Sequence, residues 1–269
     1  METFKKDIHT QIIERAKEFG ASLAGIASVK TLKKSPSHSI YGKLDPFNSV
    51  GNKEGNVEPS AVAWPEKSRS AIIIAVEHPE QKPEMDWWQT GYKGGTPGNR
   101  MLISINNKLS EWLKKEMGIQ TNPLPYHIEQ GGIFLKDTAV MAGLGCIGKN
   151  NMLVTPEYGP RVRLRVMLTE EVLPASGPVD FDPCEGCPVP CRDVCPQGAF
   201  QKTIYSEKEF GLNKLPARRG IYSRYRCNKQ MVLDEEAYEE IELEGRHQPG
   251  KLVKYCRRCE WACPVGKTG

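Results

Sequence analysis

Apolar residues recur at helical spacing in three stretches of the chain. Across residues 5–20 they fall on one face, at Ile8, Ile12, Ala16 and Phe19, and Gly20 is placed to end that helix. From Asn99 to Met117 the same spacing gives a second stripe, made of Leu102, Ile105, Leu109, Trp112 and Leu113. Residues 133–142 have a helical pattern too, and lead into the glycine-rich string AGLG. The pattern therefore predicts three helices.

Three other stretches have the pattern of β-strands. Residues 21–28 are short and apolar, and residues 71–78 (AIIIAVEH) form the β-branched run that is typical of a buried strand. Residues 161–168 (RVRLRVML) alternate, with one face made of Val162, Leu164, Val166 and Leu168. Because these strands alternate with the helices, the sequence predicts an α+β or α/β fold.

Two long segments, residues 31–60 and 78–100, are rich in Gly, Pro, Ser and charge. Loops of this length often serve as lids or binding segments, and we expect that role here.

The cysteines indicate a domain boundary. Eight of the nine lie between residues 184 and 263, and only Cys146 lies outside that range. The turn-rich run LPASGPVDFDP at 173–183 precedes them and is typical of a linker. We therefore expect a large domain over residues 1–180 and a small cysteine-rich domain over residues 181–269.

Charge and hydropathy favour a cytoplasmic protein that binds metal through its thiols. The net charge of +4 does not by itself indicate nucleic acid, and no stretch approaches the roughly 18 apolar residues that a membrane span needs. The first residues show no export signal. In a reducing compartment, clustered cysteines more often bind metal than form disulfides.

The cysteine spacing is that of iron–sulfur proteins. The run C-x2-C-x3-C-x3-C-P at 184–196 is one residue longer than the bacterial ferredoxin pattern, and a second run, C-x2-C-x3-C-P, follows at 256–264. With Cys227 the chain offers eight thiolates, enough for two [4Fe–4S] clusters. The crossed ferredoxin pattern predicts a first group of Cys184, Cys187, Cys191 and Cys263, and a second group of Cys195, Cys227, Cys256 and Cys259. Zinc, or one cluster with spare thiols, is the alternative.

Arginines gather before Cys227, at Arg218, Arg219, Arg224 and Arg226. They could neutralise anionic clusters, dock an acidic electron donor such as a ferredoxin or flavodoxin, or contact RNA.

Three glycines, Gly143, Gly145 and Gly148, fall between the third helix and the last strand. The string GLGCIG fits G-x-G-x-x-G, but it follows a helix rather than a strand, which disfavours a dinucleotide site. The glycines could form a tight corner of the chain, or let the backbone approach a ligand closely.

Together these motifs resemble those of epoxyqueuosine reductases. AGLGCIGKNN is followed by a strand, by two cysteine runs ending in Cys-Pro, and by YRC between them, while VTPEYGPRVR at 154–163 is similar to strings in reductive dehalogenases. The stretches EFGASLAGIAS and AWPEKSRSAIIIAVEHP look like the openings of the epoxyqueuosine reductase group, so the resemblance covers most of the chain. It implies a nitroreductase-like cobalamin domain followed by a ferredoxin-like domain with two clusters.

The resemblance also implies site residues. Glu129 falls where epoxyqueuosine reductases carry a catalytic aspartate, Lys136 falls at a basic position of that family, and Tyr126 is a second candidate for the proton donor. We expect the corrin to lie along residues 142–153, against backbone opened by glycine and against free Asn amides. The predicted cofactor-binding residues are Gly143, Leu144, Gly145, Cys146, Gly148, Lys149, Asn150, Asn151 and Leu153. Cys146 is expected to pack near the corrin without ligating a cluster.

Histidines are not expected to bind cobalt. None of the five, at positions 9, 38, 78, 127 and 247, lies in a D-x-H-x-x-G context, and most are expected at the surface.

The implied activity is a reductive cleavage of C–O or C–halogen bonds, driven by low-potential electrons that pass through the clusters to a corrinoid. A corrinoid-reducing or corrinoid-handling protein without its own organic substrate, and a flavin-dependent reductase, are the alternatives. The chain departs from both families, because it lacks the helical repeats that help epoxyqueuosine reductases hold tRNA and the export signal of respiratory dehalogenases. We therefore expect a short cytoplasmic member for which tRNA is not the partner.

Overall fold

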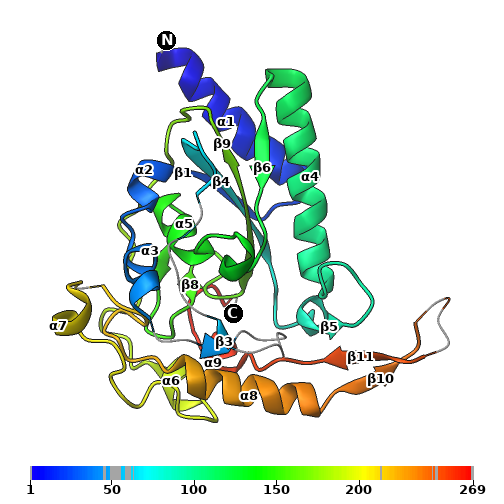
Figure 1. Ribbon diagram of the computed structural model, residues 1–269, viewed down its shortest axis with the longest axis vertical. Helices are drawn as coiled ribbons and strands as arrows, with labels where there is room; N and C mark the ends of the chain where they lie inside the picture. Colours follow the sequence, from blue (N-terminus) through cyan, green and yellow to red (C-terminus); the bar gives the residue numbers. More distant parts are fainter. Residues whose placement is uncertain are drawn as a thin grey trace.

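A computed structural model describes residues 2–44, 47–48, 56–57, 62, 64–212, 214–243, 245 and 248–267, with the backbone alone at 2–7, 47–48 and 56–57. Its centre is an antiparallel sheet with the strand order β1-β4-β9-β6 (Figure 1). The strands are β1 (Leu23–Ser28), β4 (Ser70–Glu77), β9 (Val162–Thr169) and β6 (Thr121–Pro123). The first three are the strands that the apolar pattern predicted.

Two helices cover one face of this sheet. They are α1 (Glu2–Glu18) and α4 (Pro97–Met117), and their apolar stripes pack with Ile26, Ile72 and Ile74 of the sheet in one buried cluster. The cap of α4 follows from its sequence, because the Thr96 hydroxyl accepts the Asn99 N–H at 3.1 Å and Gly118 ends the helix with a φ of 68°. Both helices confirm the sequence prediction.

The opposite face is covered by α2 (Val29–Leu32) and α5 (Leu135–Met141). Alternate residues of each strand point to this side, so Ala27, Ile73, Leu164 and Val166 form a second core with Ala139 of α5. In β9, Arg163 and Arg165 are half-buried, whereas Met167 is fully buried in the first core. The strand is therefore half-buried where it begins and buried on both faces where it ends.

The two predicted loop segments contain short elements. Residues 31–60 contribute α3 (Pro36–Ile40), η1 (Tyr41–Lys43), β2 (Phe47–Asn48) and β3 (Asn56–Val57), while part of that range lies outside the described residues. Residues 78–100 contribute η2 (Pro83–Asp86) and β5 (Trp88–Gln89), and α4 begins at Pro97.

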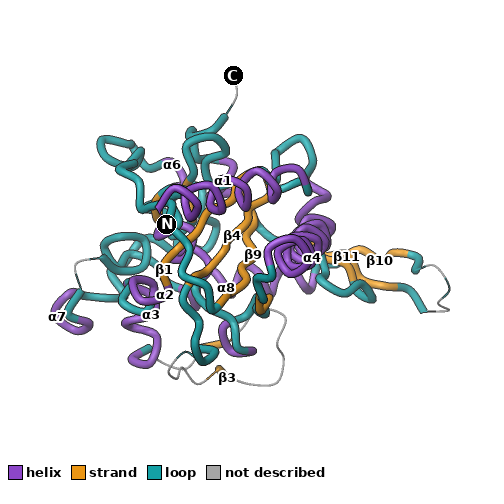
Figure 2. Tube along the Cα trace, turned by 90° about the horizontal axis from the view of Figure 1, so that it is seen from above, coloured by secondary structure: helices purple, strands orange, loops and turns teal. Residues whose placement is uncertain are grey.

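The cysteine-rich part lies across one end of the sheet (Figure 1). It contains α6 (Pro190–Asp193), α7 (Glu207–Phe210), α8 (Arg224–Glu236), α9 (Arg258–Trp261) and the hairpin of β10 (Glu239–Ile241) and β11 (Gly250–Val253). Figure 2 shows this hairpin reaching out beyond α4. The segment at 174–182, which precedes the cysteine-rich part, forms no helix or strand, and its role as a linker stays a prediction.

The two parts of the chain share a sheet. Strand β11 pairs with β5 in an antiparallel register, with Leu252 opposite Gln89 and Val253 opposite Trp88. The mixed helix-and-sheet class is as predicted. The division at residue 180, and the nitroreductase-like and ferredoxin-like character of the two parts, stay predictions.

Candidate iron–sulfur site

Four of the cysteines line one cavity of about 100 Å³. They are the second predicted group: Cys195 follows α6, Cys227 is in the first turn of α8, Cys256 precedes α9 and Cys259 is within it. Cys227 is positioned by the cap of α8, where the Ser223 hydroxyl accepts the Arg226 N–H at 3.2 Å. Lys136, Asn150 and Met152 form another part of the wall, so the cavity lies between the cysteine-rich part and the large domain.

The other four cysteines form a second neighbourhood. Burial raises the pKa of the Cys191 thiol to about 11, and the neighbouring thiols of Cys263, Cys184 and Cys187 contribute to this rise. This group joins the loop before α6 to the segment after α9. The two spatial groups have the same members as the crossed ligand sets predicted from spacing, while ligation itself stays a prediction.

All nine cysteines are unpaired thiols. Within the described part of the chain, no three His, Cys, Asp or Glu side chains form a group that could hold a single metal ion. In the second group the thiols surround a space rather than converge on a point, and a cubane that each thiolate meets at a different corner fits such a space.

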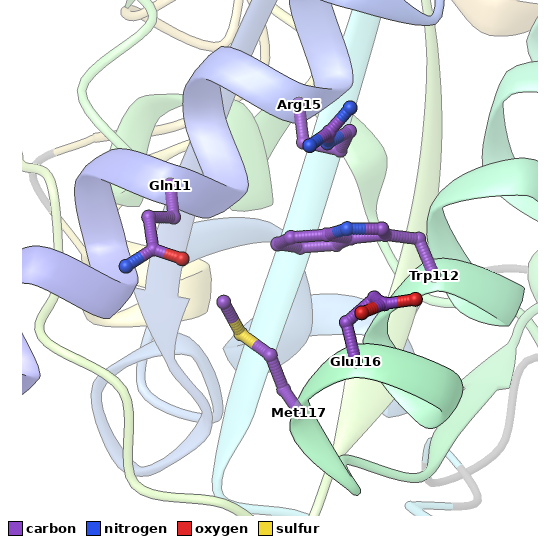
Figure 3. Close-up of a pocket in the computed structure, with 5 residues that line it drawn as sticks. All are labelled: Gln11, Arg15, Trp112, Glu116 and Met117. Atoms are coloured by element: carbon purple, nitrogen blue, oxygen red, sulfur yellow. The ribbon is translucent and has the colours of Figure 1, made fainter.

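A separate surface hollow lies between α1 and α4, far along the chain from the cysteines. Figure 3 shows its lining, in which the Arg15 guanidinium lies over the Trp112 ring, 5.2 Å from the ring centre. Gln11, Glu116 and Met117 complete the lining. None of these five residues was predicted to belong to a site, and none is a thiol or a predicted cofactor ligand.

The inserted residue of the first run lies in a tight loop before α6. Val189 has a φ of 63°, and its N–H donates to the Cys187 sulfur at 3.4 Å. The loop thus absorbs the extra residue and directs a backbone donor at a predicted ligand.

A buried ionic network fastens the second cysteine run to the large domain. Asp86 pairs with Arg163 at 2.8 Å, with Arg257 at 2.7 Å and with His78 at 2.9 Å, while Glu260 pairs with both arginines at 2.9 Å. Burial alone would raise the pKa of Asp86, but Arg163, His78 and Arg257 outweigh it and lower this pKa to about 2. Arg257 and Glu260 flank Cys256, Cys259 and Cys263, so the network holds the backbone that carries three predicted ligands.

Arg161 adds a second attachment. This buried guanidinium donates to the carbonyls of Glu260 and Cys263 at 3.2 Å each, and to that of Val265. The sequence prediction did not include these roles of Arg161 and Arg163. The sequence does carry a signal for these roles, because the arginines occupy positions of a strand that is otherwise buried.

The glycines of 142–153 are required by the chain's own packing. A Cβ on Gly145 would lie 2.0 Å from the Val154 carbonyl, in the hairpin of β7 (Cys146–Ile147) and β8 (Leu153–Val154), and one on Gly143 would lie 2.9 Å from the Ser176 carbonyl. A Cβ on Gly148 would lie 2.7 Å from Asn150 Oδ1. These contacts fit the tight-corner alternative, while the approach of a corrin to this segment stays a prediction.

Other predicted cofactor-binding residues also contact protein. Leu144 and Leu153 are buried in the core beneath the sheet. Asn150 donates to the Cys259 carbonyl at 3.3 Å and accepts the Met152 N–H, while the Asn151 side chain accepts the Ala217 N–H at 3.1 Å. The carbonyl of Lys149 accepts a bond from Arg192 at 2.8 Å. Both side chains thus tie this segment to the cysteine-rich part, and their bonds to a corrin stay a prediction.

Cys146 lies near the first cysteine group rather than apart from it. Burial raises the pKa of its thiol to about 11, with further contributions from Cys184, Asp182 and Cys263. Its expected place in the wall of a corrin site stays a prediction.

The three predicted catalytic residues lie in different settings. Lys136 lines the thiol cavity, donates to the Asn151 carbonyl at 2.5 Å, and has its pKa lowered to about 8 by burial. Glu129, in η3 (Ile128–Gln130), keeps 15% of its side chain exposed, 3.7 Å from His127 Nδ1. Tyr126 is 46% exposed and packs edge-on against the His127 ring.

A buried tyrosine near Glu129 was not predicted. Burial and the Glu129 carboxylate raise the pKa of Tyr41, whereas Arg224 lowers it. Tyr41 is 4% exposed and packs edge-on against Phe134 at 5.4 Å. The Glu129 carboxylate, the Tyr41 phenol and the Arg224 guanidinium are thus electrostatic neighbours, and Arg224 belongs to the helix that carries Cys227.

Two of the five histidines depart from the expectation that most lie at the surface. His78 is fully buried because its ring packs over Gly98, where a Cβ would lie 2.1 Å away. His38 is held by Ser35 and by the Phe134 N–H, and burial lowers its pKa to about 4. His247 lies outside the described residues.

The four arginines before Cys227 have different surroundings. Arg218 pairs with Asp182, Arg226 donates to the Gly198 carbonyl at 3.0 Å, and Arg224 is the neighbour of Tyr41. Arg219 is exposed.

The chain is similar to known epoxyqueuosine reductases that are longer than it is. No protein-family model matches the chain. The chain is 31% identical to an epoxyqueuosine reductase of Bacillus cereus over 97% of its own length and 65% of the relative's. It is 28% identical to one of Lactococcus garvieae over 75% of the chain and 53% of the relative. It therefore spans between half and two thirds of the length of these curated relatives.

Solved structures share the fold. An epoxyqueuosine reductase of Bacillus subtilis, with its catalytic loop swung out of the active site, aligns over 98% of this chain and 66% of its own, with a TM-score of 0.58 and 22% identity. A reductive dehalogenase whose structure suggests a mechanism for B12-dependent dehalogenation aligns over 96% of this chain and 32% of its own, with a TM-score of 0.58 and 16% identity. The chain is thus similar over most of its length to epoxyqueuosine reductases, and it shares the fold of the solved epoxyqueuosine reductases and reductive dehalogenases. At these identities the structural likeness shows that this fold extends over almost the whole chain.

Another solved structure with this fold is that of an epoxyqueuosine reductase bound to an epoxyqueuosine-modified tRNA stem loop, with a TM-score of 0.59 and 22% identity.

In the described part of the chain, no helix combines the length and apolar character needed to cross a membrane.

Proposed function

We propose that the protein is an iron–sulfur reductase in which two [4Fe–4S] clusters pass single electrons toward a second cofactor, a corrinoid, for the reductive cleavage of a C–O or C–halogen bond. The observation that carries the proposal is the segregation of eight cysteines into two groups of four, one of which lines a cavity. Clusters supply one-electron transfer at low potential.

The positions of the chain's own residues indicate the order in which electrons pass through the two cysteine groups. The second cysteine group lies against Lys136, and Cys227 shares α8 with Arg224, the neighbour of Tyr41 and Glu129. The first group includes Cys187, and the two residues before it, Glu185 and Gly186, are exposed. We therefore assign electron acceptance to the first group and delivery to the second.

Glu129 is the proposed proton donor of the reaction. Its side chain is mostly covered but reaches solvent, as an acid needs if it is to be reprotonated after each turnover. Tyr41 and Arg224 are placed to orient the carboxyl group.

The corrinoid is supported by the resemblance to epoxyqueuosine reductases and by the fold shared with reductive dehalogenases. Residues 142–153 stay the proposed corrin-binding segment, in which the glycines and the Asn150 and Asn151 side chains also contact the protein itself. Cobalamin stays the proposed second cofactor. Cob(II)alamin added to the reconstituted protein should change the cobalt electron paramagnetic resonance (EPR) signal. An unchanged signal, with flavin bound instead, would favour the flavin alternative.

The partner in this proposal is a small acidic electron donor, which the exposed Arg219 could attract. The substrate is a small molecule or a corrinoid. Arg219→Glu should slow reduction by a ferredoxin at low salt and leave reduction by dithionite unchanged. Equal rates with ferredoxin would exclude this docking position.

Iron analysis tests the cluster proposal directly. After anaerobic reconstitution we expect about eight irons per chain, which is two cubanes of four. Cys191→Ser and Cys227→Ser should each lose one cluster and retain the other, whereas Cys146→Ser, the matched control, should retain both. Stoichiometric zinc without broad visible absorbance would disprove the proposal.

A further inference from the structure

Tyr222 lies immediately before α8 and lines the cavity of the second cysteine group. Its side chain shares this cavity with the Cys227 thiol, and toward a ligand sulfur the phenol is the natural donor and the sulfur the acceptor. A phenol keeps its proton near neutral pH.

The ring of Tyr222 is fixed in this position. It stacks on Phe200 with the ring centres 5.7 Å apart and the planes inclined by 34°. The next residue, Ser223, donates its N–H to the Ala199 carbonyl at 2.8 Å and caps α8. The hydroxyl group is therefore held toward Cys227 by its neighbours on both sides.

The sulfurs of the two cysteine groups accept hydrogen bonds from different sets of donors. Among the described residues, the second group receives bonds from the Ala199 N–H at 3.3 Å and from the Arg258 backbone and shares its cavity with the Tyr222 phenol, whereas the first receives them from the backbones of Val189 and Val265. Tyr222 is the side-chain donor in this set. It can therefore be altered without touching the backbone.

A hydrogen bond to a ligand sulfur favours the reduced form of a cluster, because reduction adds negative charge to the iron–sulfur core and its thiolates. In this one-electron step the cluster gains one electron from the reductant and no proton moves.

We propose that Tyr222 sets the reduction potential of the second cluster by donating its hydroxyl hydrogen to the ligand sulfur of Cys227. This inference rests on the proposed function. It makes Tyr222 a positioning and tuning residue, which raises the potential of the second cluster and so favours electron transfer to it from the first.

The test compares Tyr222→Phe with Tyr255→Phe. Tyr255 adjoins another predicted ligand of the same cluster, Cys256, but its hydroxyl donates to Glu235 at 2.8 Å. Both variants remove one hydroxyl beside the cluster, and only the first removes a bond to sulfur. The readout is an anaerobic redox titration followed by EPR, with the second cluster's signal assigned in a Cys191→Ser background.

We expect Tyr222→Phe to bind as much iron as the parent protein and to shift the midpoint potential of the second cluster to a more negative value. The first cluster, and both clusters of Tyr255→Phe, should keep the parent potentials. Unshifted potentials in Tyr222→Phe at full iron content would overturn the inference, and so would a shift confined to the first cluster.

A second measurement covers the case in which Tyr222→Phe fails to assemble its cluster. Pulsed EPR of the parent protein in D2O should detect an exchangeable deuteron coupled to the second cluster, and replacing Tyr222 with a fluorinated tyrosine, a stronger donor, should shift the potential in the positive direction. Absence of both effects would refute the role of Tyr222. A parent protein without clusters would instead refute the proposed function.

Discussion

His38 is a buried neutral imidazole whose hydrogen bonds define its protonation. Nε2 accepts the Phe134 N–H at 3.2 Å, so Nδ1 carries the proton and donates to the Ser35 hydroxyl at 2.8 Å. Ser35 in turn donates to Asp137 at 2.7 Å. Protonation of Nε2 would break the bond from Phe134 and free the turn that leads into α5.

His38 should therefore make stability depend on pH. Its pKa is about 4 in the folded protein and 6.5 ordinarily, so between these values the unfolded chain binds more protons. The contribution is fully present above pH 6.5 and is lost as the pH falls toward about 4, with a size of about 2–3 kcal/mol.

The measurement is urea unfolding from pH 7 to pH 4. His38→Gln can accept and donate the same bonds without titrating, so its stability should fall less steeply over this range. His127→Gln, at an exposed ring, should follow the parent curve. Parallel curves for the parent and His38→Gln would contradict this explanation.

Gly145 offers a second test at the residue scale. A side chain there would meet the Val154 carbonyl, so Gly145→Val should destabilise the protein by about 3 kcal/mol or more through forced movement of the β7–β8 hairpin. Gly118→Ala is the control, because its φ is also positive, at 68°, while the space beside it is open. It should cost only about 1 kcal/mol. Equal losses in thermal unfolding would contradict the packing explanation.

At the scale of elements, Arg163 is the link between β9 and α9. Arg163→Met leaves the buried carboxylates of Asp86 and Glu260 with less positive charge, which should destabilise the protein by about 3–5 kcal/mol. Lys254→Met breaks an exposed pair with Glu239 and should cost less than about 1 kcal/mol. Denaturant unfolding of the reconstituted proteins would measure both, and similar small losses would show that the network is not a stabilising link.

Elements with strong local signals could be predicted from the sequence, and elements defined by partners could not. Helix α4 has a stripe, an N-cap and a terminal glycine, and β4 is a continuous β-branched run, so each is specified locally. Strand β5 has only Trp88 and Gln89, and it exists because β11 pairs with it.

The same distinction between local signals and tertiary partners applies to the residues of the candidate site. The grouping of the cysteines followed from spacing, because ligands of a cubane recur at short intervals in one run. The sequence could not show that the glycines of 142–153 pack against their own chain, since a glycine needed for such packing has the same sequence pattern as one needed for a ligand. Tyr41 and Tyr222 gave no periodic signal, and only the tertiary structure shows their neighbours.

At the scale of the whole molecule, the clusters should stabilise the cysteine-rich part. Helix α8 has no buried residue of its own, and the loops between the cysteines have few apolar contacts. Removing iron with a chelator under anaerobic conditions should therefore expose residues 184–223 to protease while the central sheet stays resistant. Identical digestion of the iron-loaded and iron-free proteins would contradict this expectation.

The pairing of β5 with β11 determines the order of assembly. Residues 88 and 253 become neighbours only after the intervening chain, which includes α4, β9 and most of the cysteine-rich part, has been closed into a loop, and closing such a loop is slow. The strand that receives β11 lies just before α4, and Arg161 and Arg163, which hold the second cysteine run, lie on the central sheet. We therefore expect the thiols of Cys256, Cys259 and Cys263 to reach their partners from the first run on a scaffold that has already folded. Iron and sulfide would then be inserted as a late step of maturation, into a chain whose larger part is already native.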